Sequence, residues 1–252
     1  MHAKQRNGGY YMENKIKNAK ILIVDDDPSI REVLSIQLKS KGHSVDQAVN
    51  GLNAVEKIKE QNDFDLIILD IMMPELSGVD ACKEIRKFTN IPVLFLTAKS
   101  QETDKSVAYE NGGDDYLVKP FSTAELFMKV DSLLRRYFIY KGKNENPSSD
   151  NSEILIADLS VNPSNKTVKR QGIKISLTDT EFDILMLLIK NKDKPVDAQE
   201  IYETVWGQKF MQSSVNTVMV HILNLRRKLN FDNDEAEVIK TVWGKGYQLN
   251  GC

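Results

Sequence analysis

Short apolar runs alternate with helical patterns over the first half of the chain. The runs are KILIV, SVDQAV, DLIILD, PVLFLTA and DYLVKP, and a segment with helical spacing follows each of them. Because parallel strands need crossover connections, this alternation predicts a parallel sheet covered by helices on both faces. We therefore expect an α/β domain of five βα units over residues 19–138.

The order of elements changes in the second half. Short β-like segments surround Asn-Pro and Gln-Gly turns, and three helical patterns follow: LTDTEFDILMLLIKN, DAQEIYETVWG and SSVNTVMVHILNLRRKL. The first opens with a capping box, Thr178 with Glu181, and the second repeats that spacing with Asp197 and Glu200. VIKTVWGKGYQLN then predicts a β-hairpin. We expect an α+β domain over residues 154–250.

Two polar segments border these domains. Residues 139–153 are expected to be a linker, because KGKNENPSSDNSE contains no apolar residue. A long surface loop within one domain is the alternative. Residues 1–18 lack the apolar core of a signal peptide and are expected to form a flexible tail, with Met12 as an alternative first residue.

Composition agrees with a soluble globular protein of two domains. The 252 residues are 41% hydrophobic and 28% charged, and no apolar run approaches the roughly 18 residues of a membrane span. Two cysteines argue against a disulfide framework and fit a reducing cytoplasm. A net charge of -2 neither requires nor excludes a nucleic-acid partner, so any basic surface must be local.

Polar residues follow the predicted strands at their carboxyl ends, which share one edge of a parallel sheet. They are Asp25, Asp26 and Asp27 after the first strand, Asp70 after the third, Thr97 after the fourth and Lys119 after the fifth. Grouped carboxylates need a cation, and oxygen-only ligation favours Mg²⁺. Asp70 would then accept a phosphoryl group whose oxygens Lys119 and Thr97 hold. Singly, each residue is more often a cap, turn or surface residue; their coincidence favours the site.

The motifs IVDDD, LDIMMPELSG, LTAK and DDYLVKPF resemble the receiver domain of bacterial two-component response regulators. The resemblance implies a flavodoxin-like sheet of strand order 2-1-3-4-5 and phosphorylation of Asp70 by a sensor histidine kinase. It also implies a Lys119–Pro120 bond that is often cis. The implied site residues are the Mg²⁺ ligands Asp25, Asp26, Asp70 and the Met72 carbonyl, the switch pair Thr97 and Tyr116, and the phosphoryl-binding Lys119.

The motifs LTDTEFDILMLLI, VWG, NTVMVHILNLRRKL and IKTVWGKGY resemble the winged-helix effector domain of the OmpR/PhoB class. The TVWGKGY segment resembles VanR-type regulators of glycopeptide-resistance operons. The resemblance implies binding to double-stranded DNA at direct-repeat promoter sites and contact with RNA polymerase. This sequence has Leu223 and Asn224 where the family often has basic residues, and Trp243 where the wing often has arginine.

The third helical pattern of this domain has an apolar stripe of Val215, Val218, Ile222, Leu225 and Leu229 and no acidic residue. Its remaining faces are expected to enter a major groove. The alternative is an ordinary amphipathic surface helix with a basic last turn. The expected DNA contacts, including those of the wing, are Asn216, Thr217, Val220, His221, Asn224, Arg226, Arg227, Lys228, Trp243 and Lys245.

Receivers of this class dimerise through a charged face, and the resemblance implies three reciprocal ion pairs. These are Lys105 with Glu125, Asp115 with Lys129, and Asp114 with Arg136. A solvated charged face is the alternative, because exposed pairs contribute under about 1 kcal/mol each. Phosphorylation is expected to shift an existing equilibrium toward the dimer.

The sequence thus predicts a cytoplasmic, DNA-binding response regulator that catalyses only its own phosphorylation and slow dephosphorylation. A phosphohydrolase or phosphotransferase with an aspartyl nucleophile is one rival, but it would need a second acid where Met72 stands. A constitutive DNA-binding protein with a degenerate receiver is the other, and the complete acidic pocket argues against it.

Overall fold

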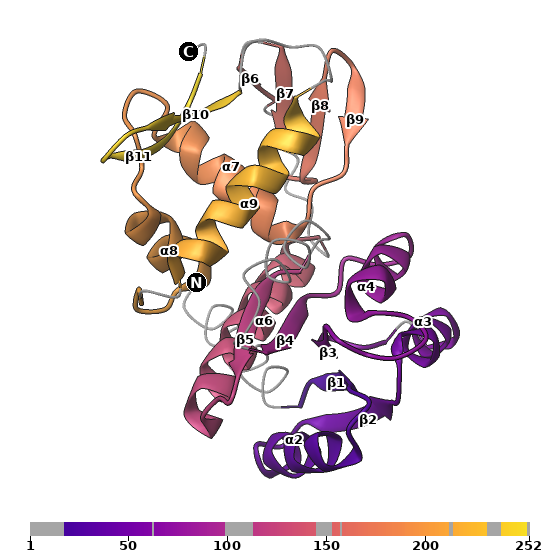
Figure 1. Cartoon of the computed structure of the whole chain (residues 1–252). Helices are drawn as coiled ribbons and strands as arrows, with labels where there is room; N and C mark the ends of the chain where they lie inside the picture. The colour runs from indigo at the N-terminus through magenta and orange to yellow at the C-terminus, as the bar shows by residue number, and fades with distance from the viewer. Residues whose placement is uncertain are drawn as a thin grey trace, which may run out of the picture. The chain divides into compact units, whose positions relative to one another are not determined.

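The chain forms two compact units, Met1–Tyr140 and Lys141–Cys252, in the computed structural model (Figure 1). The structure describes residues 18–61, 63–98, 113–144, 153–156, 158–211, 214–230 and 238–250, without the side chains of 139–144. None of the helices in these ranges is long and apolar enough to cross a membrane.

The first unit is built on a five-stranded sheet in which all neighbouring strands are parallel. The strand order is β2-β1-β3-β4-β5, which confirms the predicted topology. Every residue of β3 is buried, as an internal parallel strand requires. The strands are β1 (Lys20–Val24), β2 (Ser44–Ala48), β3 (Leu66–Asp70), β4 (Val93–Ala98) and β5 (Asp115–Lys119).

The helices described in this unit are α2 (Pro28–Ser40), α3 (Gly51–Glu60), α4 (Gly78–Arg86) and α6 (Thr123–Asn144). Leucines of α2 and α6 share one core with apolar residues of β1, β3 and β4, whereas α3 and α4 lie against each other (Figure 1). The helical pattern at residues 101–113 lies almost wholly outside the described residues. Helix α6 runs six residues into the expected linker, because extending a helix adds a hydrogen bond per residue fixed.

The second unit has the predicted order of strands, three helices and a hairpin. Its antiparallel sheet consists of β6 (Ile154–Ile156), β7 (Leu159–Asn162), β8 (Thr167–Arg170) and β9 (Ile173–Ile175). The helices are α7 (Asp179–Lys190), α8 (Ala198–Trp206) and α9 (Ser214–Leu229). Strands β10 (Ile239–Val242) and β11 (Gly246–Leu249) form the hairpin.

Local sequence signals explain where these helices begin and end. Thr178 and Glu181 form the complete capping box predicted for α7. Asp197 caps α8 by accepting a hydrogen bond from the Glu200 N–H at 2.7 Å, and Gly207 ends α8 in a left-handed conformation with φ of 64°.

The hairpin is held against the body of the second unit by a short backbone bridge. Val196 and Tyr247 exchange two N–H···O hydrogen bonds of 2.8 Å. A Cβ on the neighbouring Gly246 would lie 2.1 Å from the Val196 carbonyl oxygen. Only glycine therefore permits this close approach, which fixes the hairpin relative to the helices.

Candidate functional site

Three side chains from separate strand ends meet at the carboxyl edge of the parallel sheet. The Lys119 ammonium donates to Asp25 Oδ2 at 2.8 Å and to Asp70 Oδ1 at 2.5 Å. Asp25 follows β1, Asp70 ends β3 and Lys119 ends β5. Both carboxylates are buried, with exposures of 1% and 6%. One cation thus holds two buried carboxylates, and the Lys119–Pro120 bond is cis, as the resemblance implies.

Backbone groups orient the remaining oxygens of the two carboxylates. The Met72 N–H donates to Asp70 Oδ2 at 2.9 Å, and the Asp27 N–H donates to Asp25 Oδ1 at 2.9 Å. Arg31 Nη1 donates to the Asp25 carbonyl oxygen at 2.6 Å. Asp70 is therefore presented in a fixed orientation at the end of a rigid strand.

Burial acts in opposite directions on the pKa values of Asp70 and Lys119. Burial raises the pKa of Asp70, although the hydrogen bond from Lys119 acts in the opposite direction. Burial alone would lower the pKa of Lys119, but its hydrogen bonds to Asp25 and Asp70 outweigh burial and raise it. Lys119 therefore remains a cation and partly compensates the two acids.

Close backbone packing around Asp70 depends on Gly78 at the start of α4. A Cβ on Gly78 would lie 1.9 Å from the Asp70 carbonyl oxygen, and the Gly78 N–H donates to the Ile71 carbonyl oxygen at 3.0 Å. The sequence alone does not show this requirement. The contact that requires glycine exists only once the loop returns to β3.

The predicted switch residues lie on the paired strands β4 and β5. Thr97 is buried, and its hydroxyl donates to the Ala98 carbonyl oxygen at 3.3 Å. Tyr116 is buried too, and its ring stacks on Phe95 with centroids 5.6 Å apart. A Cβ on Gly113 would come within 2.8 Å of the Tyr116 hydroxyl, so this glycine leaves room for the inward tyrosine.

The donor set at this edge is of the type that Mg²⁺ prefers. Asp25 and Asp70 offer only oxygen atoms, while Asp26, the other predicted acidic ligand, is exposed next to them. Within the described ranges, no three or more His, Cys, Asp or Glu side chains gather as a metal site. The described site thus consists of two carboxylates joined by Lys119. A bound Mg²⁺ ion would have Asp26 and the Met72 carbonyl as further ligands.

Two rows of buried residues run along helix α9, whereas the sequence predicted one. Four residues of the predicted apolar row, Val218, Ile222, Leu225 and Leu229, are buried, and the fifth, Val215, is partly buried. Thr217, His221 and Asn224 were expected to face DNA, but they are buried together with Ser214 in a second row. The expectation of exposure is wrong because α9 packs against both α7 and α8, where the Trp206 ring lies 5.3 Å from that of His221.

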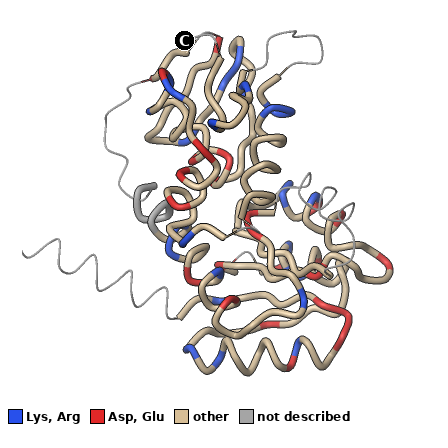
Figure 2. Tube along the Cα trace, turned by 60° about the vertical axis from the view of Figure 1, so that its left-hand side comes forward, with Lys and Arg blue, Asp and Glu red and all other residues tan. Residues whose placement is uncertain are grey.

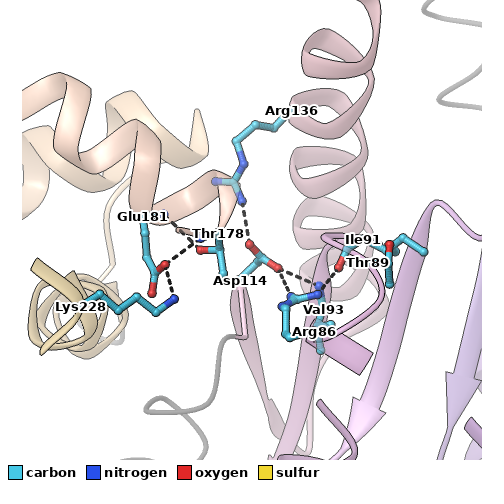
Figure 3. Close-up of polar contacts among 9 residues, drawn as sticks. All are labelled: Arg86, Thr89, Ile91, Val93, Asp114, Arg136, Thr178, Glu181 and Lys228. Carbon is cyan, nitrogen blue, oxygen red and sulfur yellow. Dashed lines mark hydrogen bonds and ion pairs between the residues drawn. The ribbon is translucent and has the colours of Figure 1, made fainter. Parts of the chain in front are cut away.

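Two of the cations expected to contact DNA are bound within the second unit. Arg226 donates to the Ile239 carbonyl oxygen and to the Thr241 hydroxyl, both at 2.7 Å. Lys228 lies 2.7 Å from the buried carboxylate of Glu181 (Figure 3). These side chains therefore tie α9 to the hairpin and to α7, a role that charge alone does not distinguish from phosphate binding.

The exposed residues of α9 form a single row. They are Asn216, Met219, Leu223 and Arg227, with Val220 partly exposed beside them. Met219 and Leu223 were not among the predicted DNA contacts, because apolar residues on a helix usually indicate a core. Acidic and basic residues are interspersed over both units (Figure 2), but α9 itself carries no acid.

The tip of the β10–β11 hairpin exposes the two predicted wing residues. Trp243 is 90% exposed, and Lys245 is exposed two residues later. Between them, Gly244 adopts φ of 72° in the turn. Among the large apolar side chains that the structure describes, Trp243 is the most exposed.

Charged residues of the first unit that were expected at a dimer interface form ion pairs within the unit. Lys129 lies 2.7 Å from Asp115, and both side chains are buried. Asp114 contacts Arg86 at 2.8 Å and Arg136 at 3.9 Å within the same chain (Figure 3). Two of the three pairs expected between subunits are thus formed within one chain, because β5 and α6 bring both partners together. Lys105, the expected partner of Glu125, lies outside the described residues.

Two family models match the two units. The response regulator receiver domain matches residues 21–131, and the C-terminal domain of transcriptional regulatory proteins matches residues 172–249. The transcriptional regulatory protein YrkP of Bacillus subtilis strain 168 is 43% identical over 230 residues, which cover 91% of this chain and 97% of YrkP. This chain belongs to the OmpR/PhoB class of two-component response regulators.

Other relatives agree with this membership. ResD of Bacillus subtilis strain 168 is 38% identical, covering 94% of this chain and 98% of ResD. VanR of Enterococcus faecium is 37% identical, covering 91% and 98%. VanR is therefore no more similar than YrkP or ResD. The solved structure of a RitR mutant has the same fold, with a TM-score of 0.70 at 22% identity, and the match covers 93% of this chain and all of the RitR chain.

Proposed function

We propose that a sensor histidine kinase phosphorylates this response regulator on Asp70 with Mg²⁺, and that the phosphorylated protein dimerises and regulates transcription. The Asp25–Lys119–Asp70 cluster carries this proposal, because it joins a fixed carboxylate nucleophile to a cation. The direct test is whether a small phosphodonor with Mg²⁺ labels Asp70.

The residues around Asp70 have separate roles in this proposal. One Asp70 oxygen attacks the phosphorus of the kinase's phosphohistidine, so that the P–O bond forms as the P–N bond breaks and the histidine leaves. The Met72 N–H holds the other Asp70 oxygen. When bound, Mg²⁺ offsets the negative charge of the carboxylates and phosphoryl oxygens, and Asp25, Asp26, Asp70 and the Met72 carbonyl would hold it. Lys119 binds one phosphoryl oxygen and the Thr97 hydroxyl another. The protein catalyses only this transfer to itself and the slow loss of the phosphoryl group.

The DNA-binding surface consists of the exposed row of α9 and the hairpin tip. Helix α9 would lie in a major groove, and Arg227 and Lys245 would neutralise phosphates. A receiver dimer would bring two such domains to direct-repeat half-sites near a promoter, where RNA polymerase is the further partner. Because these partners include DNA and a kinase that uses intracellular nucleotide, we propose that the protein acts in the cytoplasm.

Trp243 gives a direct test of the wing. We expect Trp243→Ala to weaken DNA binding about tenfold, because covering a large apolar side chain contributes about 1.5–3 kcal/mol. Trp206 is the only other tryptophan and is 3% exposed, so acrylamide quenching in wild type reports mainly on Trp243. DNA should reduce this quenching. An unchanged Kd in the variant together with unchanged quenching in wild type contradicts a role for the wing.

Dimerisation is tested by sedimentation of the full chain with beryllofluoride, a phosphoryl mimic, and Mg²⁺. We expect the mimic to increase the dimer fraction in wild type, because phosphorylation is proposed to shift an existing equilibrium. The same mixture with Asp70→Asn serves as the control and should stay at its basal mass. A wild-type mass that does not change with the mimic contradicts this part of the proposal.

A further inference from the structure

The exposed row of α9 is apolar at its centre. Met219 is 51% exposed and Leu223 is 43% exposed, and they stand four positions apart on the helix, so they lie on one face. Asn216 precedes them and Arg227 follows them on the same face. The charge that usually dominates DNA contacts is therefore confined to one end of this row.

This row is held rigidly by the rest of the helix. Val218, Ile222 and Leu225 are buried in the core of the second unit. Arg226 ties the last turn to β10, with which it makes two hydrogen bonds. Met219 and Leu223 therefore project from a fixed backbone, as residues that discriminate between bases must.

Major-groove edges of DNA offer one apolar group, the C5 methyl of thymine. We propose that Met219 and Leu223 each contact a thymine methyl, so that they determine the sequence preference of this regulator for thymine within each half-site. This inference rests on the proposed function, because it assumes that α9 lies in the major groove. Beyond the proposed function, the inference states which bases are read and which side chains read them.

The spacing of the two side chains sets the spacing of the thymines. Four residues of α-helix rise about 6 Å, and successive bases on a strand lie about 3.4 Å apart. The two thymine-dependent positions should therefore lie within about three base pairs of each other. Asn216 lies one turn before Met219 on the same face, where its amide would reach a flanking adenine edge.

Charge and size favour DNA over a protein as the occupant of this row. Helix α9 has no acidic residue, and the exposed Arg227 lies in its last turn, which complements a phosphate backbone. A stable protein interface buries about 800 Å² on each partner, far more than two side chains supply. Two methyl contacts are nevertheless sufficient to discriminate between bases.

The test replaces individual thymines by deoxyuridine, which lacks only the methyl group. DNA fragments are first selected with the full chain in beryllofluoride and Mg²⁺, and each thymine of the selected half-site is then exchanged in turn. We expect Kd to rise about fourfold at each of two positions within about three base pairs, since one buried CH₂-sized group changes affinity by about that factor. Met219→Ala should remove the deoxyuridine effect at one position and Leu223→Ala at the other.

Leu155→Ala is the matched control, because Leu155 is 74% exposed on β6, in a different element of the same unit. This variant should retain both deoxyuridine effects. If wild type binds selected DNA but tolerates deoxyuridine at every position, the inference is wrong and the proposed function stands. If no DNA fragment is enriched, the proposed function itself fails. Wild type alone decides between these two results, so they do not depend on whether a variant folds.

Discussion

Asp70→Asn is expected to abolish the increase in DNA affinity that a small phosphodonor and Mg²⁺ produce in the wild-type chain. An amide cannot form an acyl phosphate, whereas its size preserves the packing around this buried position. Coupling between two sites in a protein typically changes affinity about 5- to 150-fold, so the lost effect should be at least about fivefold. Titration of selected DNA with and without the phosphodonor measures it.

Asp27→Asn is the matched control for this substitution. Asp27 is an exposed acid close to the cluster in sequence, and its side chain caps α2 by accepting from the Ser29 N–H at 2.8 Å. Asparagine caps helices about equally well, so the phosphodonor effect should persist. An Asp70→Asn chain that still responds to the phosphodonor would show that another residue carries the phosphoryl group.

Gly78→Ala is expected to destabilise the first unit by about 3 kcal/mol, at the upper end of the usual cost of overpacking. The added Cβ would lie 1.9 Å from the Asp70 carbonyl oxygen, which belongs to backbone and cannot rotate away. Either the start of α4 or the end of β3 must therefore move. Hydrogen exchange of β1 and β3 amides in the full chain measures this loss, because amides of core strands exchange only when the unit opens as a whole.

Ser77→Ala is the control for this prediction, because it alters the adjacent position of the same helix. The Ser77 hydroxyl accepts from the Asp80 N–H at 3.2 Å and so caps α4. Losing a cap costs about 1 kcal/mol, clearly less than the backbone collision. Equal protection of β3 in wild type and Gly78→Ala would mean that the loop accommodates a Cβ.

The arrangement of the first unit was predictable because its signals are local and repeated. Continuous apolar runs such as DLIILD mark strands buried on both faces, and the polar residues that follow them must meet at one edge. The cluster of Asp25, Asp70 and Lys119 follows from this alternation alone. The need for glycine at positions 78 and 113 was not predictable, because it arises from approaches between segments that fold together.

The surface of the second unit was harder to predict from sequence. A polar residue on an amphipathic helix is normally exposed, yet His221 and Asn224 are buried because two other helices pack on α9. Conversely, Met219 and Leu223 are apolar but exposed. Periodicity identifies the one face that is most apolar, but it does not show how many neighbours a helix has.

Charged residues were similarly ambiguous before the fold was known. Lys228 in the sequence is equally consistent with phosphate binding and with its ion pair to Glu181. Asp115 and Lys129 suit a dimer interface by sign, yet they pair within one chain. Partner choice depends on which side chains the fold brings within about 4 Å, and no local pattern encodes that distance.

The central claim is that Asp70 accepts the phosphoryl group. The full chain is incubated with Mg²⁺ and a small phosphodonor, the acyl phosphate is reduced with borohydride, and the digested fragments are sequenced by mass spectrometry. The account predicts homoserine, the reduction product of an aspartyl phosphate, at position 70 and unmodified aspartate at positions 25, 26 and 27. Homoserine at another aspartate, or at none, would contradict it.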